Sequence, residues 1–133
     1  MARTTARKTI LTSSPHKKTW CTDKKLISSI IEAAGDKLAK DIKVLDITQK
    51  SSVASYFIIC TGESTPQIKA IADHIADQLA ALRHQKILLE GSARSGWIIL
   101  DLGPVLVHVM LQHERDYYKL EDLWGQSGII YHE

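Results

Sequence analysis

An acid and an imidazole interrupt the most apolar stretch of this chain, GWIILDLGPVLVHVML, which covers residues 96–111. Asp101 and His108 could belong to a catalytic group, because a carboxylate that orients an imidazole is how many hydrolases activate a nucleophile. The pair could instead be a structural contact. Together with Trp97 it could also be part of a surface that binds another molecule.

The geometry of this pair depends on the turn at Gly103-Pro104. If these residues form a two-residue hairpin turn, Asp101 faces Leu106 and lies diagonal to His108, with about 7–8 Å between the Cα atoms. A hydrogen bond is then within reach, and one face of the hairpin carries Trp97, Ile99, Asp101, Leu106, His108 and Met110. Proline is unusual as the second turn residue, and a loop one residue longer would put the pair on opposite faces. We expect the shared face.

Catalysis by such a pair also needs a nucleophile, and the only thiol expected in the folded part is that of Cys60. No G-x-S-x-G motif accompanies it, and a buried cysteine at a strand end is usually inert. His74 could bind a metal with Asp73 or Asp77, but no H-E-x-x-H motif or cysteine pair supports this. Solvated surface charges explain these residues better. We therefore expect no catalytic residue, no metal site and no cofactor.

The segment TGESTPQ at residues 61–67 joins a strand to a helix. Such a turn can hold a phosphate group at the helix N-terminus, and a nucleotidyltransferase would add carboxylates that bind a divalent metal. The expected folded part contains no D-x-D or D-x-E pair. Ser64 and Gln67 have the spacing of a capping box, with Pro66 in the first turn, so helix capping alone explains the segment.

Composition and length predict one globular domain. The chain has 133 residues, of which 44% are hydrophobic and 24% charged. No apolar run is long enough for a membrane helix, and the N-terminal residues lack the apolar core of a secretory signal. The two cysteines suggest no disulfide framework, as in a reducing compartment. We expect a cytoplasmic protein, with no membrane association and no small-molecule substrate.

Charge divides the chain into two parts. Residues 1–23 hold five basic residues and one acid, whereas the remaining residues hold twelve basic and fourteen acidic ones. We expect residues 1–21 to be a disordered basic tail and residues 22–133 to be a single domain. The alternatives for the tail are an arm that contacts nucleic acid or an organellar presequence. The mildly acidic domain suits a basic partner better than it suits nucleic acid.

Hydrophobic periodicity predicts an α/β domain with a mixed sheet of about five strands flanked by helices. A helix begins near Thr22 and carries apolar residues on one face as far as Leu38, and a second helix carries them from Ile68 to Leu82. Strands are expected at 42–48, 56–60 and 86–90, and two more flank Gly103-Pro104. The apolar strand at 56–60 is expected to be central. A short helix is predicted at 114–124.

The segment ERDYYKLEDLW at residues 114–124 collects aromatic residues beside acids. Tyr117, Leu120 and Trp124 share one helical face, and this spacing alone favours a face packed against the core. Tyr118 cannot share that face, and Glu121 and Asp122 follow it along the chain. An aromatic patch edged by acids could dock a basic protein.

Four motifs occur in order: Y-F-x-I-x-T-G, A-I-A-D, G-W-x-x-x-D-x-G-x-x-x-V-H-V and R-x-x-Y-x-L-E-x-L-W. In their order and spacing the chain resembles the ribosomal silencing factor family, also called the Iojap family, over about residues 24–124. The resemblance implies a fold like a minimal nucleotidyltransferase core without its catalytic carboxylates. It also implies a non-enzymatic translational repressor. Such a protein binds the large ribosomal subunit through universal ribosomal protein fourteen and sterically blocks joining of the small subunit.

The resemblance places the family's partner-binding signature on Trp97, Asp101, His108, Arg115, Tyr118, Leu120, Glu121 and Trp124. It implies that the apolar anchors of the contact are Trp97, Tyr118, Leu120 and Trp124. Asp101 and Glu121 would meet basic groups of the partner, and His108 would orient Asp101. Leu120 and Trp124 could instead be mainly structural.

The chain departs from the family pattern at Ser55, Pro66, Pro104 and Met110, and the assignment does not depend on these four positions. Two alternative functions stay open at this point. One is an assembly or maturation factor for the large subunit, and the other is a degenerate nucleotidyltransferase-like nucleotide binder. The same apolar patch could also close a homodimer when no ribosome is bound.

Overall fold

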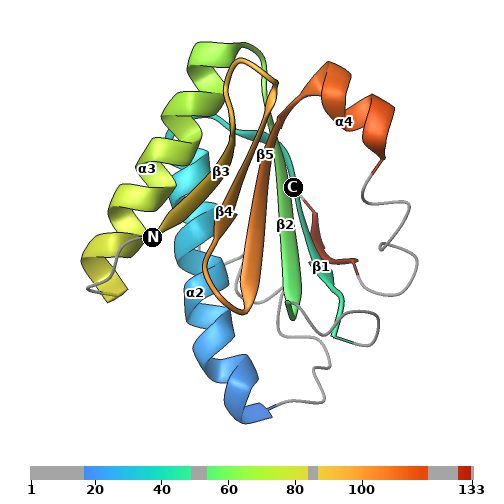
Figure 1. The fold of residues 1–133 in the computed structure, drawn as a ribbon. Coiled ribbons are helices and arrows are strands. Elements are labelled where there is room, and N and C mark those ends of the chain that lie inside the picture. Colours follow the sequence, from blue (N-terminus) through green and yellow to red (C-terminus); the bar gives the residue numbers. More distant parts are fainter. Residues whose placement is uncertain (1–16, 49–53, 84–86, 120–128, 133) are drawn as a thin grey trace.

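A computed structural model describes residues 17–48, 54–83, 87–119 and 129–132 (Figure 1). In these residues the chain forms an α/β fold with a mixed sheet, as predicted. The strand order is β3-β4-β5-β2-β1-β6. The elements are α2 (Lys17–Asp36), β1 (Lys40–Asp46), β2 (Tyr56–Gly62), α3 (Thr65–Arg83), β3 (Leu88–Ser92), β4 (Trp97–Asp101), β5 (Val105–Leu111), α4 (Gln112–Tyr118) and β6 (Ile129–His132).

The sheet has a parallel pair at its centre, formed by β2 and β5. The strands outside this pair run antiparallel to their neighbours. All seven residues of β2 are buried, as predicted for the central strand. The described part contains one strand more than the five predicted, because β6 pairs with β1 near the C-terminal end of the sequence.

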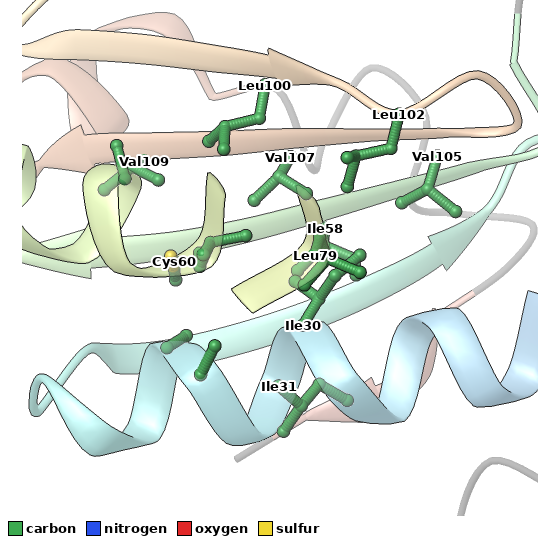
Figure 2. Packing of buried hydrophobic residues seen from close by; sticks show 14 of the residues in the cluster. Ile30, Ile31, Ile58, Cys60, Leu79, Leu100, Leu102, Val105, Val107 and Val109 are labelled. Atoms are coloured by element: carbon green, nitrogen blue, oxygen red, sulfur yellow. The ribbon is translucent and has the colours of Figure 1, made fainter. Parts of the chain in front are cut away.

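The larger core lies between the sheet and two helices that cover the same face, α2 and α3 (Figure 1). Figure 2 shows side chains of α2, including Ile30, and Leu79 of α3 meeting residues of β2 and β5. The residues that alternate with these along the strands form a second cluster on the opposite face: Leu45, Ile47, Ala54, Phe57, Ile59 and Met110, with Trp97 and Leu106 packed against it. The sheet therefore has two distinct faces, which we call the helix face and the open face.

The hairpin of β4 and β5 has the predicted register. Trp97 pairs with Met110, Ile99 with His108, and Asp101 with Leu106, so Asp101 and His108 share the open face. Gly103 and Pro104 are the two residues of the turn, and Gly103 adopts a φ of 89°, which favours glycine at this position. The Asp101 carboxylate accepts a hydrogen bond of 3.0 Å from the Gly103 amide.

Several predicted boundaries are wrong. Helix α2 begins at Lys17, before Thr22, so the helix includes residues assigned to the disordered tail. Leu38 lies beyond the helix with a φ of 64° and is 73% exposed, because the chain turns after Asp36 to enter β1. Leu82 is 63% exposed near the end of α3, beyond the part of the helix that packs on the sheet.

Two further elements are shifted along the sequence. Strand β3 covers residues 88–92 in place of 86–90, and its five residues are exposed at an edge of the sheet. Helix α4 covers residues 112–118 in place of 114–124. It begins directly after β5, and residues 120–128 lie outside the described part of the chain.

Candidate protein-interaction surface

Aromatic side chains from β2, β4, β5 and α4 lie in a row on the open face. Ring centroids are 4.7 Å apart between Phe57 and His108, 5.9 Å between His108 and Trp97, and 4.8 Å between Trp97 and Tyr118. Tyr117 follows at 4.9 Å from Tyr118. We call these five residues the aromatic row. It runs from the buried interior at Phe57 to the solvent at Tyr117.

The register of the strands explains why the row forms. His108 in β5 pairs with Ile99 on one side and with Ile59 on the other. Trp97 and Phe57 each lie two residues from these partners, so both are diagonal neighbours of His108 on the same face. Side chains at diagonal positions are within reach when they are aromatic, and here they touch.

The orientation of Trp97 is set by a hydrogen bond. Its indole Nε1–H donates to Nδ1 of His108 over 3.1 Å. Because an indole nitrogen can only donate, Nδ1 must be the unprotonated nitrogen and the proton lies on Nε2. Burial lowers the pKa of His108 from 6.5 to about 4, so the ring stays neutral at physiological pH.

His108 does not orient Asp101, contrary to the expectation. Its Nδ1 accepts from Trp97, and among the described residues Nε2 has no hydrogen-bond partner. Asp101 instead caps the hairpin turn through the Gly103 amide. The two side chains share a face, as predicted, but they serve different contacts.

Arg115 lies inside the domain, with only 2% of its surface exposed. Its Nη1 donates to the carbonyl of Asp41 at 2.6 Å and to the Thr61 hydroxyl at 2.7 Å, while Nη2 lies 3.5 Å from the Asp41 carboxylate. Asp41 has a φ of 52° at an irregularity of the β1–β2 ladder, where its carbonyl is free to turn toward the arginine. Arg115 therefore holds α4 against β1 and β2.

A close approach fixes the start of α4. The Leu111 amide donates to the Gly96 carbonyl over 2.9 Å. A Cβ on Gly96 would lie 2.7 Å from Cγ of Glu114, and the residue has a φ of 84°. Only glycine fits there without displacement, so Gly96 and Arg115 together bring Tyr118 onto Trp97.

Acidic residues lie near both ends of β4. Asp101 ends the strand and is half-buried, while Glu114 is half-buried beside Gly96, just before the strand begins. Tyr118 is 45% exposed and Tyr117 is 75% exposed. The helical spacing had suggested that Tyr117 faces the core, and the structure shows that it does not. Helix α4 ends at Tyr118, before a third turn could bury that face.

The cysteine cannot join the Asp101–His108 region. Cys60 belongs to the core of the helix face, whereas its neighbour Ile59 and His108 lie on the open face. The sheet therefore separates the thiol from the imidazole. Burial raises the pKa of the Cys60 thiol to about 12, and the nearby Arg115 only partly offsets this. The thiol stays protonated, which is the inert state.

The histidine of α3 pairs with α2 and not with the neighbouring acids. Nε2 of His74 lies 3.1 Å from a carboxylate oxygen of Asp36, and Asp73 pairs with Lys69 at 2.8 Å. Within the described ranges, no three His, Cys, Asp or Glu side chains gather as metal ligands would.

The turn after β2 is used for capping. The Ser64 hydroxyl accepts from the Gln67 amide at 3.2 Å, and the Gln67 side chain accepts from the Glu63 amide at 2.7 Å. This differs from the predicted box only in that Gln67 reaches one residue further back. A Cβ on Gly62 would lie 2.6 Å from Ile68, so this glycine serves packing of α3 against β2. These amides already have partners that a phosphate would have to replace.

The structure brings three predicted site residues into contact: Trp97, His108 and Tyr118. Asp101 shares the open face with Trp97 and His108 but bonds to the Gly103 amide, and Arg115 is buried against β1 and β2. Leu120, Glu121 and Trp124 lie outside the described residues. Sequence reasoning missed Phe57 and the partners of Arg115. Phe57 was detectable as the open-face residue that follows Tyr56, whereas nothing local pointed to Asp41 or Thr61.

The helices that the structure describes do not combine the length and apolar character of a membrane span.

Comparison with known proteins identifies the family. Residues 21–132 match the family model described as "Ribosomal silencing factor during starvation". The chain is 43% identical to Ribosomal silencing factor RsfS of Bacillus subtilis (strain 168) over 80% of this chain and 90% of that protein. It is 27% identical to the mouse protein named Mitochondrial assembly of ribosomal large subunit protein 1, over 74% of this chain and 44% of that protein.

A solved structure agrees with these matches. A crystal structure of a protein from Chromobacterium violaceum superposes with a TM-score of 0.71 at 37% sequence identity, covering 76% of this chain and 84% of that one. Fold, motifs and sequence identity point the same way over most of the chain. The chain belongs to the ribosomal silencing factor family.

Proposed function

We propose that this protein is a translational repressor that acts by binding and not by catalysis. It binds the large ribosomal subunit through universal ribosomal protein fourteen. In that position it sterically blocks joining of the small subunit. Membership of the ribosomal silencing factor family supports this proposal.

The observation that carries the proposal is the Trp97–Tyr118 pair at the exposed end of the aromatic row. The two rings lie 4.8 Å apart on the face that α2 and α3 leave uncovered. Tryptophan and tyrosine are the residues most enriched at the energetic centres of interfaces. Trp97 is half-buried and held by His108, so little side-chain entropy remains to be lost on binding.

The charges around the pair favour a basic partner. Asp101 and Glu114 lie near the two ends of β4, and the chain after residue 23 has more acidic than basic residues. Proteins that bind RNA, as ribosomal proteins do, are generally basic. Acids at the rim of an apolar contact speed association with such a partner and reject acidic surfaces.

The roles within the surface divide as follows. Trp97 and Tyr118 contact the partner, and Asp101 meets its basic groups. Arg115 acts indirectly, by holding α4 in place. We retain Leu120, Glu121 and Trp124 as proposed contacts that continue the surface beyond Lys119.

The test uses purified ribosomal subunits in sucrose gradients. The protein should co-sediment with large subunits and reduce formation of whole ribosomes when small subunits are added. Trp97→Ala should weaken binding by about thirtyfold, corresponding to about 2 kcal/mol. Leu82→Ala is the matched control, since it removes an exposed leucine from α3 on the covered side of the sheet. Full ribosome formation at stoichiometric protein would refute the proposal.

A second candidate is supported by the name of the mouse relative, which refers to assembly of the ribosomal large subunit. A maturation factor would use the same surface at an earlier time. It should bind precursor particles of the large subunit more tightly than mature subunits and leave joining of mature subunits unchanged. Gradient profiles with both kinds of particle separate the two functions.

The same surface is available to a second copy of the chain when no ribosome is present, and a two-fold dimer would bury Trp97 of both copies. Added large subunits should then dissociate the dimer, which analytical ultracentrifugation measures. We place the action of the protein wherever its ribosomes are, in the cytoplasm of a bacterial cell or in an organelle.

A further inference from the structure

We infer that His108 is a positioning residue: its imidazole holds the Trp97 indole in the single orientation in which a partner meets it. The role of a partner rests on the proposed function. The hold on Trp97 is a property of the free protein and can be tested without any partner.

The contacts of Trp97 restrain its ring from two sides. On one side the indole N–H is bonded to His108 over 3.1 Å, and on the other the Tyr118 ring lies 4.8 Å away. His108 itself cannot swing aside easily, because the Phe57 ring packs against it at 4.7 Å and only 5% of its surface is exposed. The orientation of Trp97 therefore depends on the buried contact between His108 and Phe57.

The other ring nitrogen of His108 makes the position costly for stability. With Nδ1 accepting from Trp97, Nε2 carries the proton, and this buried N–H meets no hydrogen-bond acceptor in the part of the chain that the structure describes. A buried donor without a partner is unfavourable, and an aliphatic residue would pack among Phe57, Ile59 and Leu106 without that penalty. The bond to Trp97 is what the imidazole provides and an aliphatic residue would not.

Fixing Trp97 in advance raises affinity. A half-buried tryptophan without its bond to His108 can populate other rotamers, and only the fraction in the binding orientation is competent. The apparent dissociation constant rises in inverse proportion to that fraction. Loss of one neutral hydrogen bond changes such an equilibrium by a factor of roughly three to ten.

Two variants isolate the acceptor. His108→Asn keeps an acceptor, Oδ1, at the same number of bonds from the backbone as Nδ1. His108→Leu has the same branching at Cγ but no polar atom. Circular dichroism and thermal unfolding first establish that both variants fold, and Phe57→Leu reports the effect of altered packing beside the imidazole without removing the acceptor.

The first measurement is solvent exchange of the Trp97 indole N–H, followed by NMR in the full chain. The chain has three tryptophans, and Trp97→Phe identifies the resonance. We expect exchange in His108→Leu to be about tenfold faster than in the wild type, and His108→Asn to stay within about threefold of it. Equal exchange rates in the wild type and a folded His108→Leu variant would overturn the proposal. So would equal acceleration in the Asn and Leu variants, because ring shape and not the acceptor would then matter.

The second measurement is affinity for purified large subunits. His108→Leu should bind roughly three- to tenfold more weakly, with His108→Asn restoring most of the loss. If the wild type does not bind at all, the proposed function fails, and the exchange data alone decide whether His108 holds Trp97. If the wild type binds and His108→Leu loosens Trp97 without loss of affinity, the inference fails and the proposed function stands.

Discussion

The guanidinium of Arg115 donates to the hydroxyl of Thr61 across 2.7 Å, joining α4 to the central strand β2 inside the domain. The same nitrogen also donates to the Asp41 carbonyl. One buried side chain thereby connects three elements that are far apart in the sequence. The position of Tyr118 on Trp97, and with it the exposed end of the aromatic row, depends on this connection.

Arg115→Met should lower the free energy of unfolding by about 2–4 kcal/mol, because it leaves the half-buried carbonyl of Asp41 and the buried hydroxyl of Thr61 without their charged donor. Thr61→Val removes one of these bonds and should cost about 1 kcal/mol. Urea denaturation measures both. A stability for Arg115→Met within about 0.5 kcal/mol of the wild type would show that α4 is held by other contacts.

Acid should weaken the fold through His108. Its pKa is about 4 in the folded domain against 6.5 as the ordinary value, so the unfolded chain takes up a proton first as the pH falls. The contribution of the neutral His108 imidazole to the free energy of unfolding is complete above pH 6.5. It is lost progressively as the pH falls from 6.5 to 4, and no further loss from this residue follows below pH 4. The total is roughly 3 kcal/mol. Denaturation midpoints across this range should fall less steeply for His108→Leu, and parallel curves would contradict the assignment.

The thiol of Cys60 should resist modification while the domain is folded. In a Cys21→Ser variant Cys60 is the sole thiol of the chain. Its burial and its pKa of about 12 leave almost no thiolate at pH 8, so a disulfide reagent should react at least roughly a hundredfold more slowly than in denaturant. Rapid reaction of the native variant would mean that the core on the helix face opens.

Gly96 and Gly103 provide a test of the α4 contact. Both have positive φ, but a Cβ on Gly103 would meet nothing within 4 Å, whereas one on Gly96 would strike Glu114. Gly103→Ala should cost about 1–2 kcal/mol from backbone strain alone, and Gly96→Ala should cost more. Adding Glu114→Ala to Gly96→Ala removes the Glu114 Cγ atom that the new Cβ would contact. The double variant should regain the additional stability that Gly96→Ala loses relative to Gly103→Ala. Equal losses for both glycine variants in urea denaturation would refute the contact.

Asp101 should affect how fast a basic partner associates. Asp101→Asn removes the charge but keeps an oxygen that can accept from the Gly103 amide. We expect association with large subunits to slow by roughly two- to fivefold at low salt, with the difference vanishing at high salt. Asp77→Asn, on the exposed side of α3, is the matched control and should leave the rate unchanged. A salt-independent loss would point to the turn and not to the charge.

Local sequence patterns alone predicted the β4–β5 hairpin and helix α3. Alternation along β4 and β5, with glycine at the one position that needs positive φ, sets the hairpin register and puts Trp97, Asp101 and His108 on one face. Helical spacing and the Ser64 cap likewise predict α3. These features depend on neighbours in sequence, which is why the sequence alone reveals them.

Only the tertiary structure decided which partner each polar group takes. His108 accepts a hydrogen bond from Trp97 and does not bond Asp101. The Trp97 ring reaches it from the neighbouring strand, and the Asp101 carboxylate accepts from the Gly103 amide in the turn. Arg115, assigned from the sequence to the binding surface, is buried because its partners Asp41 and Thr61 approach from distant strands. Burial is a property of the assembled layers, so no local spacing could separate the residues that form the surface from those that hold it in place.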